Sequence, residues 1–166
     1  MRCPTCGFEN LLGSDICDNC GSDLAGHDTP QSATTFRGRL LGEPLDQLDI
    51  AAPEIVDAGA DVDEAIRRMH EKGIDCVLVV DGGRLVGIFT DRDAVLKVAG
   101  TKAGGQPISR LMTRDPVVLR HDETIAVALN KMAVGGFRHI PIVENGRPTG
   151  VVSARDVFHH LAESLG

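Results

Sequence analysis

The chain repeats itself at a period of 63 residues. Shifting the sequence by 63 positions places the segment 75–95 on the segment 138–158. The identical pairs are Val80/Val143, Gly83/Gly146, Arg84/Arg147, Gly87/Gly150, Arg92/Arg155 and Asp93/Asp156. A single copy of this size is marginal, because its sheet face and helices remain uncovered, whereas two copies bury those faces against each other.

Each copy contains a predicted amphipathic helix. An N-cap residue, Asp61 or Thr124, precedes apolar residues at positions i, i+3, i+4 and i+7, and a glycine (Gly73 or Gly136) follows. The same order of signals in both copies predicts the same element in each.

The helix is followed by hairpin signals. Apolar runs at 76–80 and 140–143 predict strands, and turn residues at 81–83 and 144–146 lead into a second strand. A second helix then begins at Thr90 or Ser153. The predicted fold is α/β (α+β), with two β-α-β-β-α repeats packed with pseudo-two-fold symmetry and clefts between the halves.

Composition excludes several functional classes. Apolar residues make up 42% of the 166 residues and aromatic residues only 3%, which predicts a globular chain with an aliphatic core. The net charge of −7 argues against general nucleic-acid binding, which needs Lys and Arg. No apolar run approaches the ~20 residues of a membrane helix, and the N-terminal MRCPTC lacks a signal-peptide layout. We therefore expect a cytoplasmic protein.

Four of the five cysteines form two C-x-x-C pairs, each followed by a glycine: Cys3, Cys6, Cys17 and Cys20. This spacing lets both thiolates of a pair face one cation, and four sulfurs match the tetrahedral set that zinc prefers. The alternatives are iron in a rubredoxin-like site and a disulfide pair. Residues 1–25 resemble a short zinc ribbon with a closed, structural site. The ribbon carries a net charge of −3 before the metal, which favours contact with protein over contact with DNA.

The predicted domains are the zinc ribbon at 1–25, a linker at 26–43, repeat 1 at 44–104 and repeat 2 at 105–166. The linker is rich in Gly, Ser and Thr, and we expect it to end in an element led by Leu40 and Leu41. Cys76 stands apart in an apolar strand and is predicted to be a buried, inert thiol.

The repeat carries a family resemblance. Gly87-Ile-Phe-Thr90-Asp-Arg-Asp93 and Gly150-Val-Val-Ser153-Ala-Arg-Asp156 resemble the G-h-h-[TS]-x-x-D signature of CBS domains, where h is apolar. Leu111-Met-Thr113 before Pro116-Val-Val118, and the run 138–143, also resemble that family. Two signatures in equivalent frames indicate a tandem CBS pair, or Bateman module, over about residues 44–166.

The resemblance implies ligand sites. CBS pairs bind adenosine nucleotides or S-adenosylmethionine in their clefts. By this analogy Asp93 and Asp156 accept hydrogen bonds from ribose hydroxyls, and Thr90 and Ser153 hold ribose or phosphate at a helix N-terminus. In the second site, Val117 and Pro141 flank adenine, with Thr113 nearby. The simpler interpretation is that Thr90 and Ser153 are N-caps and that the two acids favour the helix dipole.

The two sites are predicted to be unequal. Arg138 and His139 precede the strand of repeat 2, whereas Asp75 and Cys76 occupy the matching positions of repeat 1. With Arg155 beside the second motif, the Asp156 site is the predicted stronger binder of charged nucleotides. The alternative is that Arg138 and His139 form a solvated strand end.

No catalytic motif is found, so an enzyme is not expected. The leading hypothesis is a stand-alone regulatory module that senses an adenine nucleotide or S-adenosylmethionine and signals to an unidentified protein partner. The resemblance also implies a homodimer formed through exposed helices. The alternatives are a nucleic-acid-associated regulator that reads through its ribbon, and a structural adaptor with vestigial ligand sites.

Overall fold

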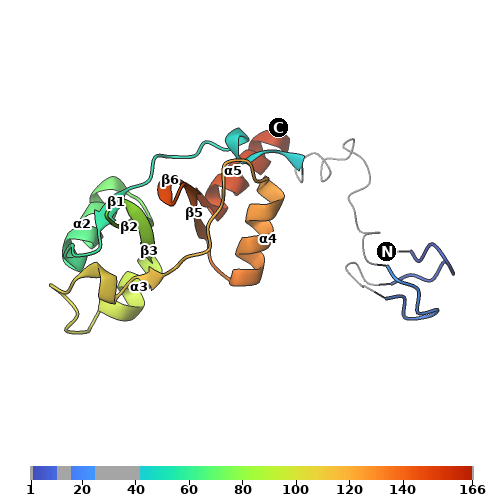
Figure 1. Ribbon diagram of the computed structural model, residues 1–166, viewed down its shortest axis with the longest axis horizontal. Coiled ribbons are helices and arrows are strands. Elements are labelled where there is room, and N and C mark those ends of the chain that lie inside the picture. The colour runs from blue at the N-terminus through green and yellow to red at the C-terminus, as the bar shows by residue number, and fades with distance from the viewer. Residues whose placement is uncertain (1, 11–15, 25–41, 166) are drawn as a thin grey trace. The chain divides into compact units, whose positions relative to one another are not determined.

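The computed structural model describes residues 2–10, 16–24 and 42–165 (Figure 1). The chain divides into two compact units, Met1–Gly42 and Glu43–Gly166. Both predicted repeats lie in the larger unit. The predicted linker, with Leu40 and Leu41, falls almost wholly outside the described residues.

The smaller unit contains two similar turns that lie 14 residues apart in the sequence. The N–H of Gly7 donates to the carbonyl of Cys3, and the N–H of Gly21 donates to that of Cys17, each over 2.9 Å. Gly7 has φ +76° and Gly21 has φ +70°, a backbone conformation that favours glycine. Each cysteine pair is thus followed by a tight turn at its glycine.

The elements of the larger unit follow one another as η1 (Leu45–Gln47), β1 (Ile55–Asp57), α2 (Val62–Lys72), β2 (Cys76–Asp81), β3 (Arg84–Thr90), α3 (Asp91–Asp93), η2 (Ala94–Val98), η3 (Ile108–Arg110), β4 (Thr113–Arg114), α4 (Ile125–Gly135), β5 (His139–Glu144), β6 (Arg147–Ser153) and α5 (Ala154–Leu165). The mixed α and β composition agrees with the predicted fold class.

Repeat 1 forms a four-stranded sheet in the order β1-β2-β3-β4. β1 runs parallel to β2, and the other neighbours are antiparallel. The β2–β3 hairpin turns at Gly82 and Gly83, which both have positive φ. This two-residue turn matches the right-handed twist of the strands, and the predicted hairpin is confirmed.

Repeat 2 keeps the hairpin but shortens the first strand. β5 and β6 pair antiparallel around Asn145 and Gly146, which have φ +53° and +80°. The strand expected before α4 is reduced to a parallel bridge between Leu119 and Ile142. This bridge lies 63 positions after the pairing of Val56 with Val79 in repeat 1.

The first helix of each repeat begins and ends as predicted. The side chain of Asp61 accepts from the N–H of Asp63, and that of Thr124 accepts from the N–H of Val127. Gly73 and Gly136 end α2 and α4 in the left-handed conformation.

The second helices differ, which the sequence did not predict. In repeat 2, α5 is a regular helix of 12 residues. In repeat 1 the equivalent segment is the three-residue α3 followed by a π-helical turn, η2, and Gly100 then adopts φ +72°. The π turn widens the helix just after Asp93, the acid of the repeat 1 motif.

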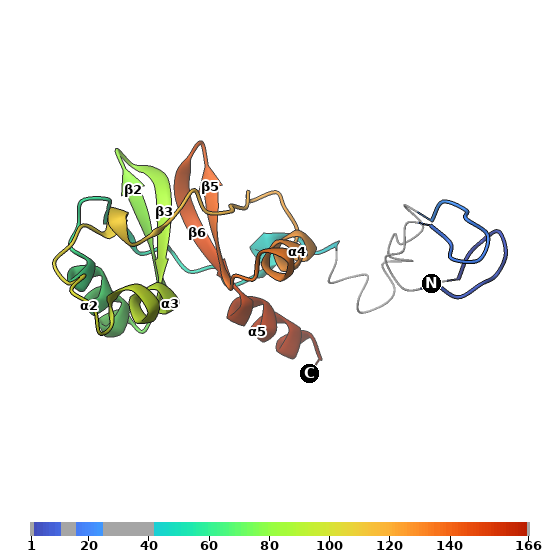
Figure 2. The ribbon, with the colours of Figure 1, turned by 90° about the horizontal axis from the view of Figure 1, so that it is seen from below.

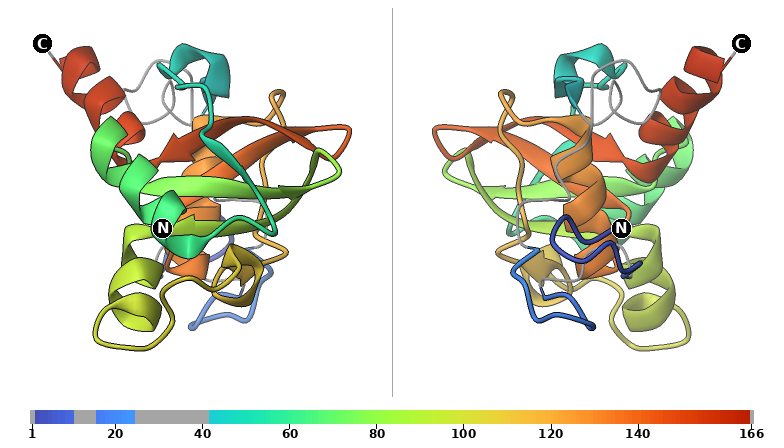
Figure 3. Two further views of the ribbon diagram at one scale, coloured as in Figure 1. Left: turned by 90° about the vertical axis from the view of Figure 1, so that its left-hand side faces the viewer. Right: turned by 90° about the vertical axis from the view of Figure 1, so that its right-hand side faces the viewer.

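The first few residues of each repeat pair with the other repeat. Pro107 bridges to Asp61 of repeat 1, and Pro44 bridges to Thr124 of repeat 2. Because these contacts are related by the 63-residue shift, the larger unit has the predicted pseudo-two-fold symmetry. Figures 2 and 3 show the two hairpins side by side, with the helices around them.

The core is mainly aliphatic, as expected, although the ring of Phe89 is also fully buried. Cys76, Leu78 and Ile88 form a buried cluster that packs against Val151 of repeat 2, which joins the two repeats. Within the described part of the chain, no helix is both long and apolar enough to cross a membrane.

Candidate functional site

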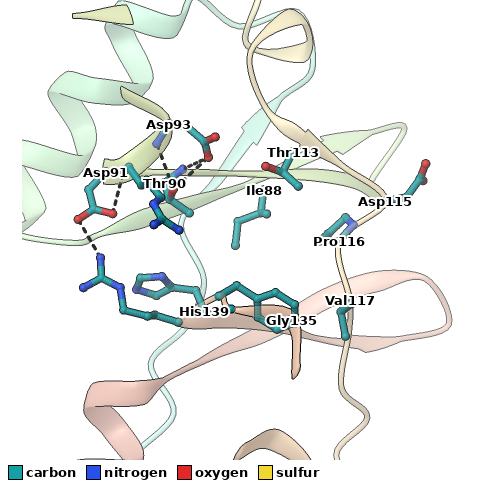
Figure 4. Close-up of a pocket in the computed structure, with 14 residues that line it drawn as sticks. Ile88, Thr90, Asp91, Asp93, Thr113, Asp115, Pro116, Val117, Gly135 and His139 are labelled. Carbon is teal, nitrogen blue, oxygen red and sulfur yellow. Dashed lines mark hydrogen bonds and ion pairs between the residues drawn. The ribbon is translucent and has the colours of Figure 1, made fainter. Parts of the chain in front are cut away.

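A pocket of about 360 Å³ opens between the two repeats. It is lined by Ile88, Thr90, Asp91, Arg92, Asp93, Thr113, Asp115, Pro116, Val117, Gly135, Gly136, Phe137, Arg138 and His139. Figure 4 shows the motif residues of repeat 1 on one side and His139 of repeat 2 on the other. The connecting segment, residues 111–118, closes the pocket with Pro116 and Val117.

The motif of repeat 1 forms a capping box. The side chain of Thr90 accepts from the N–H of Asp93, and Asp93 Oδ2 accepts from the Thr90 N–H (3.0 Å) and hydroxyl (2.9 Å). The other carboxylate oxygen, Oδ1, lies 2.7 Å from Lys97 Nζ. The capping interpretation of these residues is therefore correct, and it leaves the carboxylate rigid at the edge of the pocket.

The basic side of the pocket comes from repeat 2. Arg138 reaches across to repeat 1, where its Nη2 lies 3.5 Å from Asp91 Oδ2. His139 lies beneath Thr90 and Asp91 in Figure 4. Arg92 supplies a further cation at the same edge.

The opposite wall is apolar. Ile88, Pro116 and Val117 line it, and Val117 keeps 46% of its surface exposed in the open pocket. Phe137 also lines the pocket, and its ring lies directly over Gly135, where a Cβ would approach to 1.9 Å. The pocket thus has a flat apolar end suited to a planar base and a charged end suited to a polar group.

Six of the predicted nucleotide-binding residues meet in this pocket: Thr90, Asp93, Thr113, Val117, Arg138 and His139. Arg138 and His139, which the sequence analysis assigned to the Asp156 site, line the pocket that holds Thr90 and Asp93. This placement follows from the tertiary structure and not from the order of residues along the chain. His139 pairs with Ser153 along the backbone of the hairpin, but its side chain faces repeat 1 across the pseudo-two-fold axis.

The other predicted residues lie elsewhere. Pro141 is buried inside β5, where its carbonyl accepts from the N–H of Leu119. Ser153 and Asp156 form a second capping box with bonds of 2.7 and 2.8 Å to Asp156 Oδ2. Arg155 and Asp156 line a separate polar pocket of about 250 Å³ with Gln47, Asp49, His159, His160 and Glu163.

Burial shifts two titrating groups near the pseudo-two-fold axis. It lowers the pKa of His139 below its ordinary value of 6.5, although Asp75 and Asp91 oppose the shift. Burial, reinforced by Asp75 and Asp91, raises the pKa of Cys76 to about 12. The prediction that Cys76 is a buried thiol is confirmed, and its raised pKa keeps it protonated at neutral pH.

The four N-terminal cysteines form the cluster expected of a metal site. Their sulfurs lie within 4.8 Å of one another, with 3.7 Å between Cys3 and Cys20 and 3.7 Å between Cys6 and Cys17. A tetrahedron with Zn–S bonds of about 2.3 Å has S···S edges of about 3.8 Å, so the sulfur set fits such an ion.

Hydrogen bonds within the smaller unit favour the thiolate form of two of the four cysteines, Cys17 and Cys20. Burial opposes ionisation of Cys17, but donors from the backbone of Cys20 and Asn19 and from the Asn10 side chain lower its pKa to about 6. The hydroxyl and backbone of Ser22 lower the pKa of Cys20. Thiolate is the form that binds a metal.

Comparison with known proteins identifies the larger unit. A family model for the CBS domain matches residues 49–100 and 108–163, more than half of the chain. The chain belongs to the CBS-domain family. The two matched segments make it a tandem CBS pair.

Relatives and solved structures agree. The CBS domain-containing protein CBSCBSPB5 of Arabidopsis thaliana is 33% identical over 139 residues. That match covers 81% of this chain but only 25% of the plant protein, so the chain spans about a quarter of that relative. The structure of the CBS-domain protein ATU1752 from Agrobacterium tumefaciens is 36% identical with a TM-score of 0.60, over 64% of this chain and 87% of that one.

The CBS domain pair of protein MJ0100 is also similar. It is 26% identical with a TM-score of 0.65, over 72% of this chain and 94% of that one. Its structure was solved in complex with 5′-methylthioadenosine and S-adenosyl-L-methionine.

Among the residues that sequence reasoning did not select are Phe137, which lines the pocket, and Lys97, which contacts Asp93. Phe137 is the pocket's aromatic side chain, and the adjacent glycine pair at 135–136 was a usable signal, since an aromatic ring can pack on glycine. Lys97 lies at i+4 from Asp93, a spacing that allows an ion pair on a helix.

Proposed function

We propose that this CBS pair is a regulatory module that binds an adenosine-containing ligand in the pocket between its repeats. The ribose hydroxyls bind Asp93, the base packs on Val117, Pro116 and Phe137, and a 5′-phosphate lies beside Arg138 and His139. The observation that carries the proposal is that one pocket combines the Asp93 carboxylate of repeat 1 with the Arg138 guanidinium and the His139 imidazole of repeat 2.

The charge of the pocket suggests which ligands fit. The charged residues that line the pocket are two cations, Arg92 and Arg138, and three anions, Asp91, Asp93 and Asp115. Asp91 is paired with Arg138, and Asp93 with Lys97. This near balance favours a ligand with one phosphate, or an adenosyl ligand with none, over a triphosphate. The adenosyl ligands of the MJ0100 pair support the same class.

The Asp156 motif faces a less favourable environment for phosphate. Arg155 Nη2 lies 4.0 Å from Asp75 Oδ2, and Cys76 replaces the histidine of the other repeat. We therefore assign the stronger binding of a nucleotide to the Asp93 pocket, which reverses the order predicted from the sequence.

The module acts through protein contacts rather than by catalysis. Val95 and Phe158 occupy equivalent positions on the last helix of each repeat, and both are 66% exposed. We propose that two copies of the chain form a homodimer through the apolar face that contains Val95 and Phe158. We also propose that the four-cysteine unit holds a structural zinc ion and contacts a further protein.

Size-exclusion chromatography with light scattering tests the dimer. We expect Phe158→Asp to yield monomers, because it places a charge in the apolar face. Val134→Asp is the control, since Val134 is 82% exposed on α4 rather than on the last helix of either repeat, and it should leave the dimer intact. A wild type that is monomeric at all concentrations contradicts the dimer.

Isothermal titration of AMP into the full chain tests the ligand site. Asp93→Ala and Asp156→Ala are matched variants, because each removes the acid of one capping box. We expect Asp93→Ala to weaken AMP binding by about tenfold or more, since hydrogen bonds to a charged group contribute about 1.5–3 kcal/mol. Asp156→Ala should leave the affinity within about twofold of wild type.

Other outcomes have defined meanings. Loss of binding in Asp156→Ala alone restores the assignment predicted from the sequence. No binding of AMP, S-adenosylmethionine or 5′-methylthioadenosine to the wild type rules out the ligand-sensing proposal and favours a structural adaptor.

A further inference from the structure

Lys97 contacts both Asp93, which lines the pocket, and the connecting segment, although it lies outside the pocket itself. Its Nζ lies 2.7 Å from Asp93 Oδ1 and donates a 2.7 Å hydrogen bond to the carbonyl of Leu111. Lys97 itself does not line the pocket. It therefore contacts the carboxylate on a side that a ligand in the pocket does not use.

The two partners of Lys97 belong to the two halves of the proposed ligand site. Asp93 is the ribose acceptor, and Leu111 begins the connecting segment that carries Thr113, Pro116 and Val117. The Lys97 ammonium group thus links the Asp93 carboxylate to the connecting segment, which forms the wall that faces the base in the proposal.

The carboxylate is fully oriented by these contacts. Thr90 holds Oδ2 with its N–H and hydroxyl, and Lys97 holds Oδ1. Thr90 occupies both acceptor directions of Oδ2, and Oδ1 keeps one direction beside Lys97, so Oδ1 can still accept a hydrogen bond from a ribose hydroxyl. The ammonium also offsets the charge of Asp93 near a phosphate.

Repeat 2 lacks this arrangement. The position equivalent to Lys97 is His160, which hydrogen-bonds to Glu43 Oε2 over 2.6 Å instead of turning to Asp156. Among the residues that the structure describes, Oδ1 of Asp156 has no hydrogen-bond partner. The anchoring lysine is therefore a property of one site and not of the fold.

We propose that Lys97 is a positioning residue that makes the Asp93 pocket selective for ligands that carry ribose hydroxyls. This inference rests on the proposed function. It adds that ribose recognition depends on a side chain outside the pocket, which holds Asp93 in the orientation in which Oδ1 accepts a hydroxyl group.

Lys131 offers a matched control. Its Nζ donates to the carbonyl of Val118 over 2.9 Å and lies 2.8 Å from Glu123 Oε1. Like Lys97, it joins a carboxylate to the connecting segment, and its side chain is similarly accessible, 29% against 39%. Neither of these contacts involves Asp93.

The experiment compares AMP with 2′,3′-dideoxyadenosine 5′-monophosphate in the full chain. We expect the wild type to prefer AMP by about tenfold or more, because hydroxyl donors to a carboxylate are charge-assisted bonds. In Lys97→Met we expect weaker binding of AMP, close to the affinity of the dideoxy ligand. The affinity of the dideoxy ligand itself should change little from that of the wild type. Lys131→Met keeps the wild-type ratio, and thermal unfolding with each variant shows whether the losses of stability are comparable.

A double-mutant cycle completes the test. If Lys97 acts through Asp93, Asp93→Asn abolishes the preference for AMP and Lys97→Met causes no further loss in that background. An equal loss of both ligands in Lys97→Met, or a collapsed ratio in Lys131→Met, overturns the inference and leaves the proposed function standing. Failure of the wild type to bind either ligand overturns the proposed function itself.

Discussion

Arg138 of repeat 2 and Asp91 of repeat 1 form an ion pair across the pocket, with 3.5 Å between Nη2 and Oδ2. Both side chains are largely exposed, 69% and 47%, so the pair is weak and readily exchanged. A ligand phosphate competes with Asp91 for the same guanidinium.

Removal of this competitor should strengthen phosphate binding. We expect Asp91→Asn to raise the affinity for AMP by up to about fivefold, which corresponds to the ~1 kcal/mol upper range of exposed ion pairs. Titration calorimetry measures the change, and Asp81→Asn, at the exposed end of β2, is the control. An unchanged or lower affinity in Asp91→Asn contradicts a phosphate at Arg138.

Gly87 should tolerate no side chain. A Cβ at this position lies 2.3 Å from Met112 Sδ and 3.0 Å from the carbonyl oxygen of Thr113, and the backbone atom cannot move aside easily. Gly87→Ala is expected to lower the free energy of unfolding by about 1–3 kcal/mol through overpacking. Urea denaturation provides the measurement.

Gly150→Ala and Gly42→Ala are comparison variants for that measurement. A Cβ at Gly150 lies 2.8 Å from Cγ2 of Ile50, in the segment before β1, so Gly150→Ala should also lower the free energy of unfolding. A Cβ at Gly42 has no atom within 4 Å, so Gly42→Ala should leave it unchanged. Equal stability of Gly87→Ala and Gly42→Ala would show that the connecting segment does not pack on β3 as described.

Stability should depend on pH through His139. Because burial lowers the pKa of His139 in the folded chain, the unfolded chain takes up a proton on this ring at a higher pH than the folded chain does. The free energy of unfolding therefore falls as the pH drops below about 6.5.

Urea titrations at about pH 7.5 and about pH 5.5 test this linkage. His139→Gln should reduce the loss of stability between the two conditions, while His121→Gln, at an exposed site, should not. The same loss in His139→Gln and wild type argues that other groups cause the pH dependence.

The cysteine cluster should bind one metal ion per chain. Metal analysis of the purified protein by mass spectrometry is expected to find zinc, with iron as the alternative, and Cys17→Ser should lose it. Cys76→Ser is the control and should keep the metal, since Cys76 lies in the buried cluster of the other unit. Loss of metal in neither variant, or absence of metal from the wild type, contradicts the site.

Much of the fold could be read from the sequence because its signals are local. N-caps at Asp61 and Thr124, left-handed glycines at Gly73 and Gly136, and the hairpin turn at Gly82–Gly83 depend on one residue and its neighbours. The irregular π turn of η2 was not predictable in this way, since the equivalent residues of repeat 2 form a regular helix.

The sequence by itself determined the repeat, the pairs of capping residues and the clustering of four cysteines, since periodicity and short spacings express local backbone geometry. Only the tertiary structure decided which residues share a pocket. Arg138 and His139 lie in the same repeat as the Asp156 motif, but they line the pocket that holds Thr90 and Asp93 of the other repeat. Contacts across such an axis depend on how two repeats pack, and that information is distributed over the whole interface rather than carried by any one motif.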